Sequence, residues 1–326
     1  METVLQIAGG LVLLGLGGEG VVRGAVGVAR RFGLSELLIG ITLVGLGGAM
    51  PELLTSINAA MHGATAIAVG NVVGSNISNV LLIIGLAAFL RPLPVDQKSL
   101  ERDGGALMLL SVAAAGWSIF VPAINWIGGL VMLAMLAGYI TFTYRTEQHA
   151  PTASSTLMHQ IEAAHHKSLD LPFALGITVI SIAALVLGAD LLVQGGVALA
   201  QSAHVPQGFI GLTVVAIGTS LPELAACVTA SLRGRPDLVM GTIVGSCIYN
   251  MLGVLGATAL IAPVHILHDF SAITWVAFVG APVLLVGHAA TGERVSKVEG
   301  GFMLFLYGLY IWYLSTHLTL DGLVSQ

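Results

Sequence analysis

Charged residues are scarce in this chain. Lys and Arg number 12 and Asp and Glu 17 among 326 residues, so charged types make up 9% of the sequence, whereas a soluble domain carries about 25%. The chain therefore has too few charged side chains to cover a water-soluble globule, which excludes an ordinary cytosolic enzyme and a disordered protein. Because acidic residues outnumber basic ones, no basic stripe is available for nucleic acid.

Cysteine is scarce as well. The chain has 2 cysteines, Cys227 and Cys247, and both lie inside apolar stretches. We expect buried packing residues rather than a disulfide framework. The sequence also lacks a G-x-x-x-x-G-K-[ST] phosphate-binding loop, and it gives no sign of a resident cofactor.

Apolar residues and glycine are abundant instead. Hydrophobic types make up 56% of the chain, and glycine accounts for 42 residues. A membrane-spanning helix needs about 20 apolar residues, and small residues allow such helices to pack closely. The sequence predicts an all-α membrane protein with ten transmembrane helices. The expected spans are roughly 4–29, 34–60, 66–90, 104–121, 125–144, 171–200, 207–232, 238–262, 270–288 and 299–317. The first is interpreted as a span and not as a signal peptide, because it lacks a basic n-region.

The basic residues follow alternate spans. Lys and Arg occur in or beside the loops after the first, third, fifth, seventh and ninth expected spans, and none occurs after the second, fourth, sixth or eighth. Under the positive-inside rule, all the basic loops are cytoplasmic and both termini lie outside. We expect an integral membrane protein, located in a prokaryotic inner (plasma) membrane.

The chain contains an internal repeat. Sliding the sequence along itself by 171 residues places GITLVGLGGAMPELLTS (40–56) over GLTVVAIGTSLPELAAC (211–227), and GNVVGSNISNVLLIIG (70–85) over GTIVGSCIYNMLGVLG (241–256). The identical pairs include Pro51/Pro222, Glu52/Glu223, Gly74/Gly245, Ser75/Ser246 and Asn79/Asn250. The repeat predicts two five-helix halves, residues 1–145 and 171–326, joined by a polar cytoplasmic linker at 146–170.

The two halves are expected to be inverted relative to each other. Arg30 and Arg31 of the first half stand where the second half has uncharged residues, and Arg233 and Arg235 of the second half stand where the first half has no Lys or Arg. Equivalent loops therefore carry opposite charge bias. This is the inverted-repeat architecture of many secondary transporters. The linker contains His149, His159, His165 and His166; a metal-binding or pH-sensing role is one interpretation, and a solvated linker is the one we favour.

Glu52 and Glu223 lie in the middle of apolar segments. A charge at the centre of a bilayer costs about 2.5–3.5 kcal/mol even on lenient scales, and no Lys or Arg lies at comparable depth. Their partners must therefore be protons, each other through a shared proton, or bound cations. Each Glu follows a proline, Pro51 or Pro222, which frees a carbonyl one turn earlier. The carbonyls near 44–48 and 215–219 are then available as oxygen ligands.

Further oxygen ligands accompany the carboxylates. Ser75 and Asn79 share one helix face because they are four residues apart, and Ser246 and Asn250 do the same. Thr219 and Ser220 add hydroxyls beside Glu223. These are hard ligands suited to Ca²⁺, which takes roughly six to eight oxygens, or to Na⁺. A second symmetric acidic pair, Glu19 and Asp190, is expected near the interface, with Glu19 able to pair with Arg23.

These motifs resemble the Ca²⁺:cation antiporter superfamily, the Na⁺/Ca²⁺ exchanger-like proteins, and look closest to its small prokaryotic members. The family's G-T-S-x-P-E segment is matched at 218–223, and its G-N-x-x-G-S-N-x-x-N/D segment at 70–79. The resemblance covers both repeats. It implies a secondary-active antiporter, not an enzyme, that exchanges Ca²⁺ for Na⁺ by alternating access without a resident cofactor. It implies that Glu52 and Glu223 are central ion ligands, supported by Asn79, Asn250, Ser75, Ser246, Thr219 and Ser220. The implied partners are the transported cations and membrane lipid.

Both repeats depart from the family pattern. Gly48 and Ala49 stand where the family has hydroxyls, Asn250 stands where many members have Asp, and Cys247 and Thr242 replace asparagines. We therefore hypothesise that Na⁺ coupling is weakened, with fewer Na⁺ ions per cycle or protons instead.

Several alternatives remain at this stage. One is a proton-coupled exchanger of Ca²⁺ or another divalent cation on the same fold. A passive cation channel is a second, and a membrane scaffold is a third, although a scaffold would not need paired buried acids. An intramembrane hydrolase needs a base near its serine, and no histidine falls in the spans that carry Ser220 or Ser246.

Overall fold

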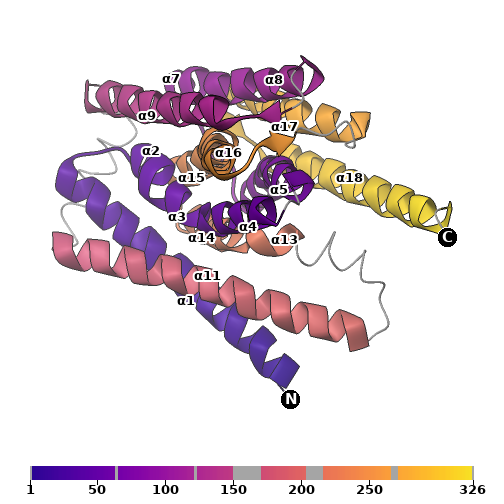
Figure 1. Ribbon diagram of the computed structural model, residues 1–326. Helices are drawn as coiled ribbons and strands as arrows, with labels where there is room; N and C mark the ends of the chain where they lie inside the picture. Colours follow the sequence, from indigo (N-terminus) through magenta and orange to yellow (C-terminus); the bar gives the residue numbers. More distant parts are fainter. Residues whose placement is uncertain are drawn as a thin grey trace.

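A computed structural model describes residues 2–62, 65–120, 123–149, 170–202, 216–265 and 271–324 (Figure 1). The described chain is mostly helical. Its long helices are α1 (Glu2–Phe32), α8 (Gly105–Phe120), α9 (Trp126–His149), α11 (Leu171–Ser202), α17 (Ala272–Gly292) and α18 (Lys297–Val324).

The remaining helices are short segments that follow one another directly along the sequence. In the first part of the sequence these are α2 (Glu36–Ile39), η1 (Gly40–Val44), α3 (Gly45–Gly48) and α4 (Met50–Met61), then α5 (Thr65–Ile77), η2 (Ser78–Ile84) and α6 (Gly85–Leu90). In the second part they are α13 (Ala216–Thr219) and α14 (Leu221–Leu232), then α15 (Pro236–Ile248), η5 (Tyr249–Val254) and α16 (Leu255–Ile261). Before α8 lie α7 (Gln97–Ser99) and η3 (Leu100–Gly104). The segments labelled η are π-helical, a wider winding that is frequent at functional sites.

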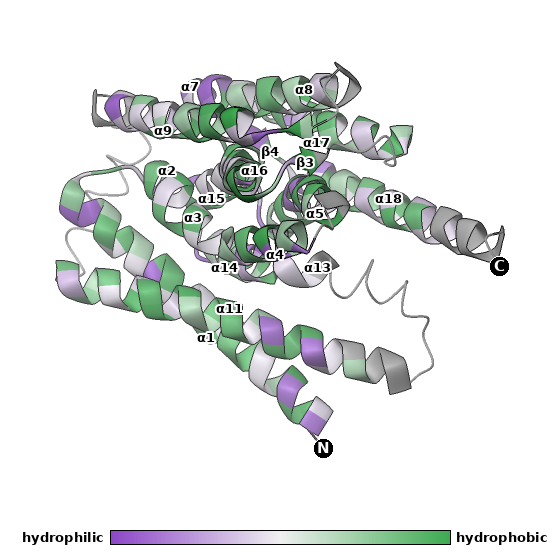
Figure 2. Ribbon diagram, in the orientation of Figure 1, coloured by the Kyte–Doolittle hydropathy of each residue, from purple (hydrophilic) through white to green (hydrophobic). Residues whose placement is uncertain are grey.

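The expected spans coincide with these helices, as far as the described residues reach. By length and apolarity, 6 helices among the described residues could cross a membrane, or 7 if the bent pair Glu36–Gly48 and Met50–Met61 counts as one span. The helices are green along most of their length in Figure 2. The count of ten spans stays a prediction. Most of the predicted histidine-containing linker, residues 150–169, lies outside the described residues. The first residues of the predicted linker, 146–149, form the end of α9.

Helices α1 and α11 lie against each other at one side of the bundle (Figure 1). Glycines make this contact close: a Cβ on Gly10 would meet the Gly188 carbonyl oxygen at 2.8 Å, and one on Gly188 would meet the Gly10 carbonyl oxygen at 3.0 Å. Small residues of this kind let helix backbones approach without a layer of large side chains. The same pair packs on α14 mainly through α1.

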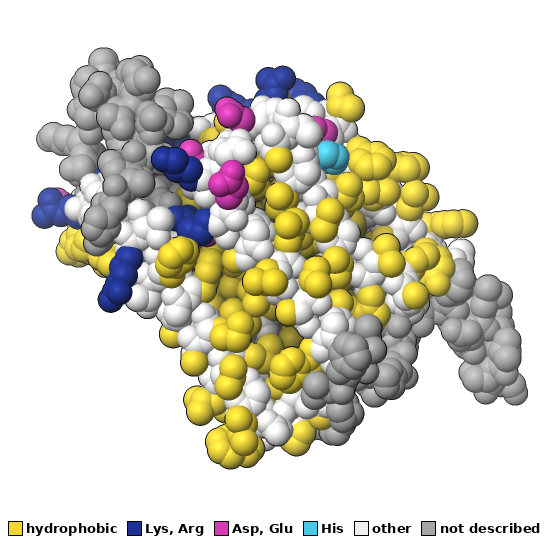
Figure 3. Space-filling model, turned by 90° about the horizontal axis from the view of Figure 1, so that it is seen from above, with side chains coloured by type: hydrophobic (Ala, Val, Ile, Leu, Met, Phe, Trp, Pro, Cys, Tyr) yellow, Lys and Arg dark blue, Asp and Glu magenta, His cyan; other side chains and the backbone are white. Residues whose placement is uncertain are grey.

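The interrupted helices form the centre of the molecule. In the apolar window of Pro236–Ile261, which joins α15 to α16, 94% of residues are buried, whereas 11% are buried in Trp126–Thr146 of α9. Exposed apolar side chains such as Trp126, Ile127 and Leu130 cover the outer helix. Figure 3 shows hydrophobic side chains over much of one face, with Lys and Arg gathered toward one edge. An apolar exterior suits lipid, while the central helices hold the polar groups described below.

Helix α15 touches the α2–η1–α3 chain backbone to backbone. A Cβ on Gly40 would meet the Leu238 carbonyl oxygen at 2.9 Å, and one on Gly245 would meet the Ile41 carbonyl oxygen at 2.8 Å. Any larger residue at these positions would separate the helices, because the neighbouring atoms belong to the backbone and cannot turn aside. This contact sets the separation between the two parts of the site.

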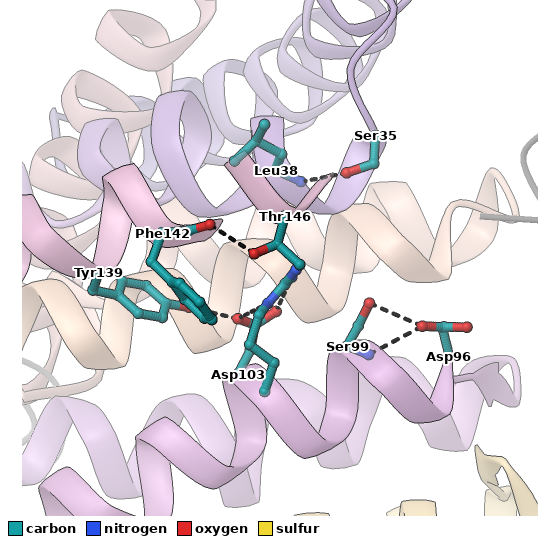
Figure 4. A network of polar contacts seen from close by, with 9 residues as sticks. Ser35, Leu38, Asp96, Ser99, Asp103, Tyr139, Phe142 and Thr146 are labelled. Atoms are coloured by element: carbon teal, nitrogen blue, oxygen red, sulfur yellow. Dashed lines mark hydrogen bonds and ion pairs between the residues drawn. The ribbon is translucent and has the colours of Figure 1, made fainter. Parts of the chain in front are cut away.

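Two short antiparallel strand pairs join loops. Strand β1 (Leu93–Pro94) pairs with β4 (Arg294–Val295), and β2 (Ala123–Ile124) pairs with β3 (Val264–His265). A polar network ties α9 to η3 (Figure 4): buried Asp103 accepts a hydrogen bond from the Tyr139 hydroxyl at 3.0 Å and pairs with the Arg102 guanidinium at 2.7 Å. These contacts join α9 to the turn that leads into α8.

Candidate cation site

Two helix breaks position the acidic residues. Helix α3 gives way to α4 at Ala49 (φ −75°, ψ 0°), and α13 gives way to α14 at Ser220 (φ −91°, ψ 6°). The first break bends the chain by 42°. Pro51 and Pro222 each lie in the first turn of the helix that follows, where a missing N–H is tolerated. The sequence predicted the breaks; the prolines begin new helices rather than kink continuous ones.

Glu52 and Glu223 lie in the first turns of α4 and α14. Their exposed fractions are 0% and 1%. A helix N-terminus offers partial positive charge, which offsets part of the cost of burying a carboxylate. No Lys or Arg forms an ion pair with either carboxylate among the described residues.

The two halves of the chain meet at these acids. A Cβ on Gly48 would lie 2.8 Å from Glu223 Oε1 and 2.9 Å from its Cδ. The end of α3 therefore packs directly on the carboxylate of α14, and glycine leaves the space that this carboxylate fills. Glu223 also lines a small cleft together with Val44, Gly48, Ile182, Leu185, Pro222, Ala226 and Thr242. Ile182 and Leu185 belong to α11, so this helix forms one wall of the cleft.

The predicted hydroxyl ligands are all near the breaks, but they contact different groups. The Ser75 hydroxyl donates to Glu52 Oε1 at 3.4 Å, whereas the Ser246 hydroxyl donates to the Gly45 carbonyl oxygen at 3.3 Å. Ser220 occupies the second break and is buried. Thr219 is the last residue of α13, just before that break. Of the backbone carbonyls predicted as ligands, that of Gly45 is already engaged by Ser246 and by the Ala49 N–H at 3.0 Å.

The predicted amides lie in the π-helical segments, Asn79 in η2 and Asn250 in η5, and both are 0% exposed. Asn250 Nδ2 donates to Asn76 Oδ1 at 3.2 Å, and Asn76 Nδ2 donates to the Cys247 carbonyl oxygen at 3.2 Å. The sequence did not identify Asn76 as a site residue. Its position within the repeated G-N-x-x-G-S-N-x-x-N segment was the signal.

Asn71, in the same segment, supports the other acid. Its Nδ2 donates to the Glu52 carbonyl oxygen at 3.1 Å and to the Ser56 hydroxyl at 3.0 Å. These bonds fix the first turn of α4 on α5. Thr242, which stands at the equivalent place in the second half, lacks an amide and lines the cleft beside Glu223 instead.

Buried oxygens without a hydrogen-bond partner are concentrated at this site. Within the described part of the protein they include Glu52 Oε2, both carboxylate oxygens of Glu223, Asn79 Oδ1, Asn250 Oδ1 and Ser220 Oγ. Native proteins leave few buried polar atoms unpaired, so a cluster of six on neighbouring helices marks a place built to bind something that accepts lone pairs. Protons and hard cations do so.

The donor set fits a hard cation and not a soft metal. It comprises two carboxylates, two amide oxygens and hydroxyls, and the described residues contain no group of three or more His, Cys, Asp or Glu placed to hold a metal ion. Cys227 and Cys247 are free and buried. Zinc sites need Cys or His ligands in tetrahedral geometry, whereas Ca²⁺ and Na⁺ accept mixed oxygen ligands.

The second acidic pair is asymmetric. Glu19 of α1 bonds to Arg23 at 2.6 Å, as the sequence predicted, and also to Arg233 at the end of α14 at 2.8 Å. Asp190 of α11 instead accepts a hydrogen bond from Gln194 at 2.8 Å. The position equivalent to Arg233 is His62, whose ring Nδ1 lies 2.8 Å from the Asn58 carbonyl oxygen. Hence α1 is tied to α14 by charge, and the equivalent α11–α4 tie is absent among the described residues.

Known proteins are similar in sequence to this protein over nearly the whole chain. The chain is 35% identical over 308 residues to the putative antiporter CaxA of Alkalimonas amylolytica, covering 91% of this chain and 94% of that one. It is 31% identical to the sodium/calcium exchanger MaX1 of Methanosarcina acetivorans, covering 93% and 95%, and 32% identical to the inner membrane protein YrbG of Escherichia coli, covering 95% and 97%.

A solved structure agrees with the fold. The sodium-calcium exchanger NCX_Mj, soaked with zero Na⁺ and Ca²⁺, superimposes with a TM-score of 0.82 at 29% identity, covering 95% of this chain and 98% of that chain. The family model described as sodium/calcium exchanger protein matches residues 3–145 and 173–316. This chain is therefore an integral membrane cation antiporter that belongs to the sodium/calcium exchanger protein family.

Proposed function

We propose that this antiporter exchanges Ca²⁺ for Na⁺ and that Glu52 and Glu223 together hold the transported cation. The observation that carries the proposal is the cluster of unpaired buried oxygens around the two carboxylates. Asn79, Asn250, Ser75, Ser246, Thr219 and Ser220 supply the supporting ligands. Two carboxylates neutralise one Ca²⁺ or two Na⁺, so the two cations compete for the same negative cage. Such competition is a physical basis for exchange.

The architecture that we propose is two inverted five-helix repeats, residues 1–145 and 171–326, forming ten spans. Its support is the recurrence of local features 171 residues apart. The breaks at Ala49 and Ser220, the π-helical segments beginning at Ser78 and Tyr249, and the strands β1 and β3 all obey this spacing. The strand pairs also join only loops that the charge pattern puts on the same side of the membrane.

Alternating access would follow from movement of α1 and α11 past the central helices. These two helices pack mainly on each other, and the cleft beside Glu223 lies against α11. The orientation that we propose has the basic loops in the cytoplasm and both termini outside. An inner membrane location is supported by the description of the relative YrbG as an inner membrane protein.

A proton-coupled exchanger of Ca²⁺ or another divalent cation is the second candidate. Gly48 and Ala49 supply no hydroxyl at the first break, whereas Thr219 and Ser220 do so at the second. The site therefore offers fewer ligands for a second Na⁺, and protons on the carboxylates would balance the charge equally well.

The deciding experiment is ⁴⁵Ca²⁺ uptake into proteoliposomes under three conditions: an outward Na⁺ gradient, a matched K⁺ gradient and a pH gradient. Uptake that needs internal Na⁺ and is lost in Glu223→Gln supports Na⁺/Ca²⁺ exchange. Uptake driven by the pH gradient alone selects the proton-coupled candidate. Uptake without any counter-ion gradient, at equal rates for Na⁺ and K⁺, would indicate a channel and contradict the proposal.

A further inference from the structure

The two ligand amides of the site are held differently. Asn250 has a fixed orientation, because its Nδ2 donates to Asn76 Oδ1 at 3.2 Å and Asn76 is itself anchored on the Cys247 carbonyl oxygen. Its own Oδ1 is left unpaired within the described residues. For Asn79, neither Oδ1 nor Nδ2 has a hydrogen-bond partner there, although the side chain is 0% exposed.

The difference follows from one substitution between the repeats. Asn76 and Cys247 occupy equivalent positions, 171 residues apart, as do Asn79 and Asn250. An amide at 76 offers the oxygen that Asn250 needs. The Cys247 thiol interacts with the Asn79 amide, but its side chain is shorter than that of Asn and its sulfur is a weak acceptor. Asn79 therefore has a weaker anchor than its counterpart.

A merely structural explanation of this arrangement is poor. Leaving both polar ends of a buried amide unpaired is unfavourable, and packing alone would be served better by an apolar residue at 79. Burial of the amide becomes favourable only when its oxygen faces a cation. Because only the weak contact with the Cys247 thiol holds its nitrogen, the amide can turn about its side-chain torsions to follow that cation.

We propose that residue 247 is a positioning residue that sets how firmly Asn79 is held, and that Cys247 makes this side of the cage adaptable to divalent cations of different size. The inference rests on the proposed function, since it assumes that Asn79 and Asn250 face the transported ion. Selectivity among hard cations depends on cavity size, ligand number and ligand flexibility. One tethered amide and one free amide give a cage that is set on the Asn250 side and adjustable on the Asn79 side.

The test is competition of Mn²⁺, which is smaller than Ca²⁺, and Sr²⁺, which is larger, against ⁴⁵Ca²⁺ bound to the purified full-length protein. Cys247→Asn restores the missing amide and is expected to tether Asn79. The measured quantity is the spread, defined as the ratio between the Mn²⁺ and Sr²⁺ competition constants, each taken relative to Ca²⁺. We expect Cys247→Asn to widen this spread by about threefold to tenfold, which corresponds to the contribution of one neutral hydrogen bond. Cys247→Ala removes the thiol without adding an acceptor, and we expect it to keep the wild-type spread.

A second variant tests the same idea from the other half. Asn76→Cys removes the anchor of Asn250 and is expected to narrow the spread, so the proposal remains testable even if Cys247→Asn does not fold. Equal spreads in Cys247→Asn and Cys247→Ala, or an unchanged spread in Asn76→Cys, would overturn it. Failure of the proposed function is distinguishable, because it appears as absence of gradient-driven uptake, whereas this inference is read from binding selectivity.

Discussion

The two halves of this antiporter have the same framework and differ in how it is filled. Both break a helix just before a Pro-Glu pair, and both place an asparagine in a π-helical segment that follows. Yet the first half has Gly48 and Ala49 at its break, where the second has Thr219 and Ser220, and the second has Cys247 where the first has Asn76. The framework is duplicated, while the ligand shell is not.

This difference shows which parts of the site must be symmetric. The carboxylates are duplicated, as the proposed binding of a divalent cation by two negative charges requires. The surrounding groups differ between the halves, and each difference changes one contact: Gly48 makes room for Glu223, and Cys247 leaves Asn79 only weakly anchored. The asymmetry therefore tunes the site without removing its central charge.

The largest expected effect comes from removing either charge. Glu52→Gln and Glu223→Gln are each expected to lower divalent uptake by a hundredfold or more. Removing one member of a buried charged set costs about 3–5 kcal/mol, which is on the order of a hundredfold to several thousandfold in affinity. The measurement is the initial rate of ⁴⁵Ca²⁺ uptake in proteoliposomes, with Glu101→Gln as control because Glu101 is exposed. If one of the two variants transports normally, the symmetric role of the acids is wrong.

Gly48→Ala is expected to have the next largest effect. The added Cβ would lie 2.8 Å from Glu223 Oε1, so the carboxylate must move. Displacement of a reacting or binding group by about 1 Å can cost up to about a hundredfold, and we expect a fall in uptake of about tenfold or more. Gly74→Ala is the matched control, because nothing lies within 4 Å of a Cβ at Gly74. Equal behaviour of the two variants would show that Gly48 has no such role.

Alanine variants of Ser75 and Ser246 are expected to differ in their effects on Ca²⁺ binding and on thermal stability. Ser75→Ala removes a hydrogen bond to the Glu52 carboxylate, whereas Ser246→Ala removes one to the Gly45 backbone. Each bond is worth about 0.5–1.5 kcal/mol. We expect Ser75→Ala to weaken Ca²⁺ binding by a few fold with little change in melting temperature, and Ser246→Ala to lower the melting temperature more. Binding and thermal unfolding measured on both purified variants decide this, and a reversed pattern would contradict the assigned contacts.

The smallest effect is expected at the α1–α14 tie. Glu19→Gln weakens the ion pairs with Arg23 and Arg233, whose side chains are 64% and 57% exposed. Exposed ion pairs contribute about 0–1 kcal/mol and are screened by salt. Thermal unfolding should therefore show a small loss of stability at low salt that disappears at high salt. Asp190→Asn is the comparison, because within the described residues Asp190 accepts a hydrogen bond from the neutral side chain of Gln194 and forms no ion pair. We expect this variant to show no salt-dependent difference.

The sequence predicted the helical class, the positions of the helices and the burial of both acids. These predictions rest on two strong signals. An apolar segment of about 20 residues predicts a membrane-spanning helix, and a glutamate at equivalent positions in two apolar segments indicates that both have the same role. The free, buried state of Cys227 and Cys247 was also predicted correctly. The number of spans, the inverted relation of the halves and the ligand roles stay predictions.

Other features could not be predicted because they depend on contacts between the halves. That Gly48 packs on Glu223 needs the separation of α3 and α14, which the backbone contact between η1 and α15 sets. The bond between Asn76 and Asn250 likewise joins residues 174 positions apart in sequence. Arg233 was assigned to a cytoplasmic loop from its charge, but its pairing with Glu19 requires the tilt of α1 across the bundle. Periodicity and composition carry no information on such distances.

The central claim is that the two halves contribute one carboxylate each to a single cation cage, and equilibrium ⁴⁵Ca²⁺ binding to the purified protein tests it most directly. Binding would be measured at saturation for wild type, Glu52→Gln, Glu223→Gln and the double variant. Residues that act as one unit are not additive, so each single variant should lose as much bound Ca²⁺ as the double variant. If each single variant instead retained about half of the wild-type Ca²⁺ and only the double variant lost it all, the acids would form two independent sites, and the shared cage would be contradicted.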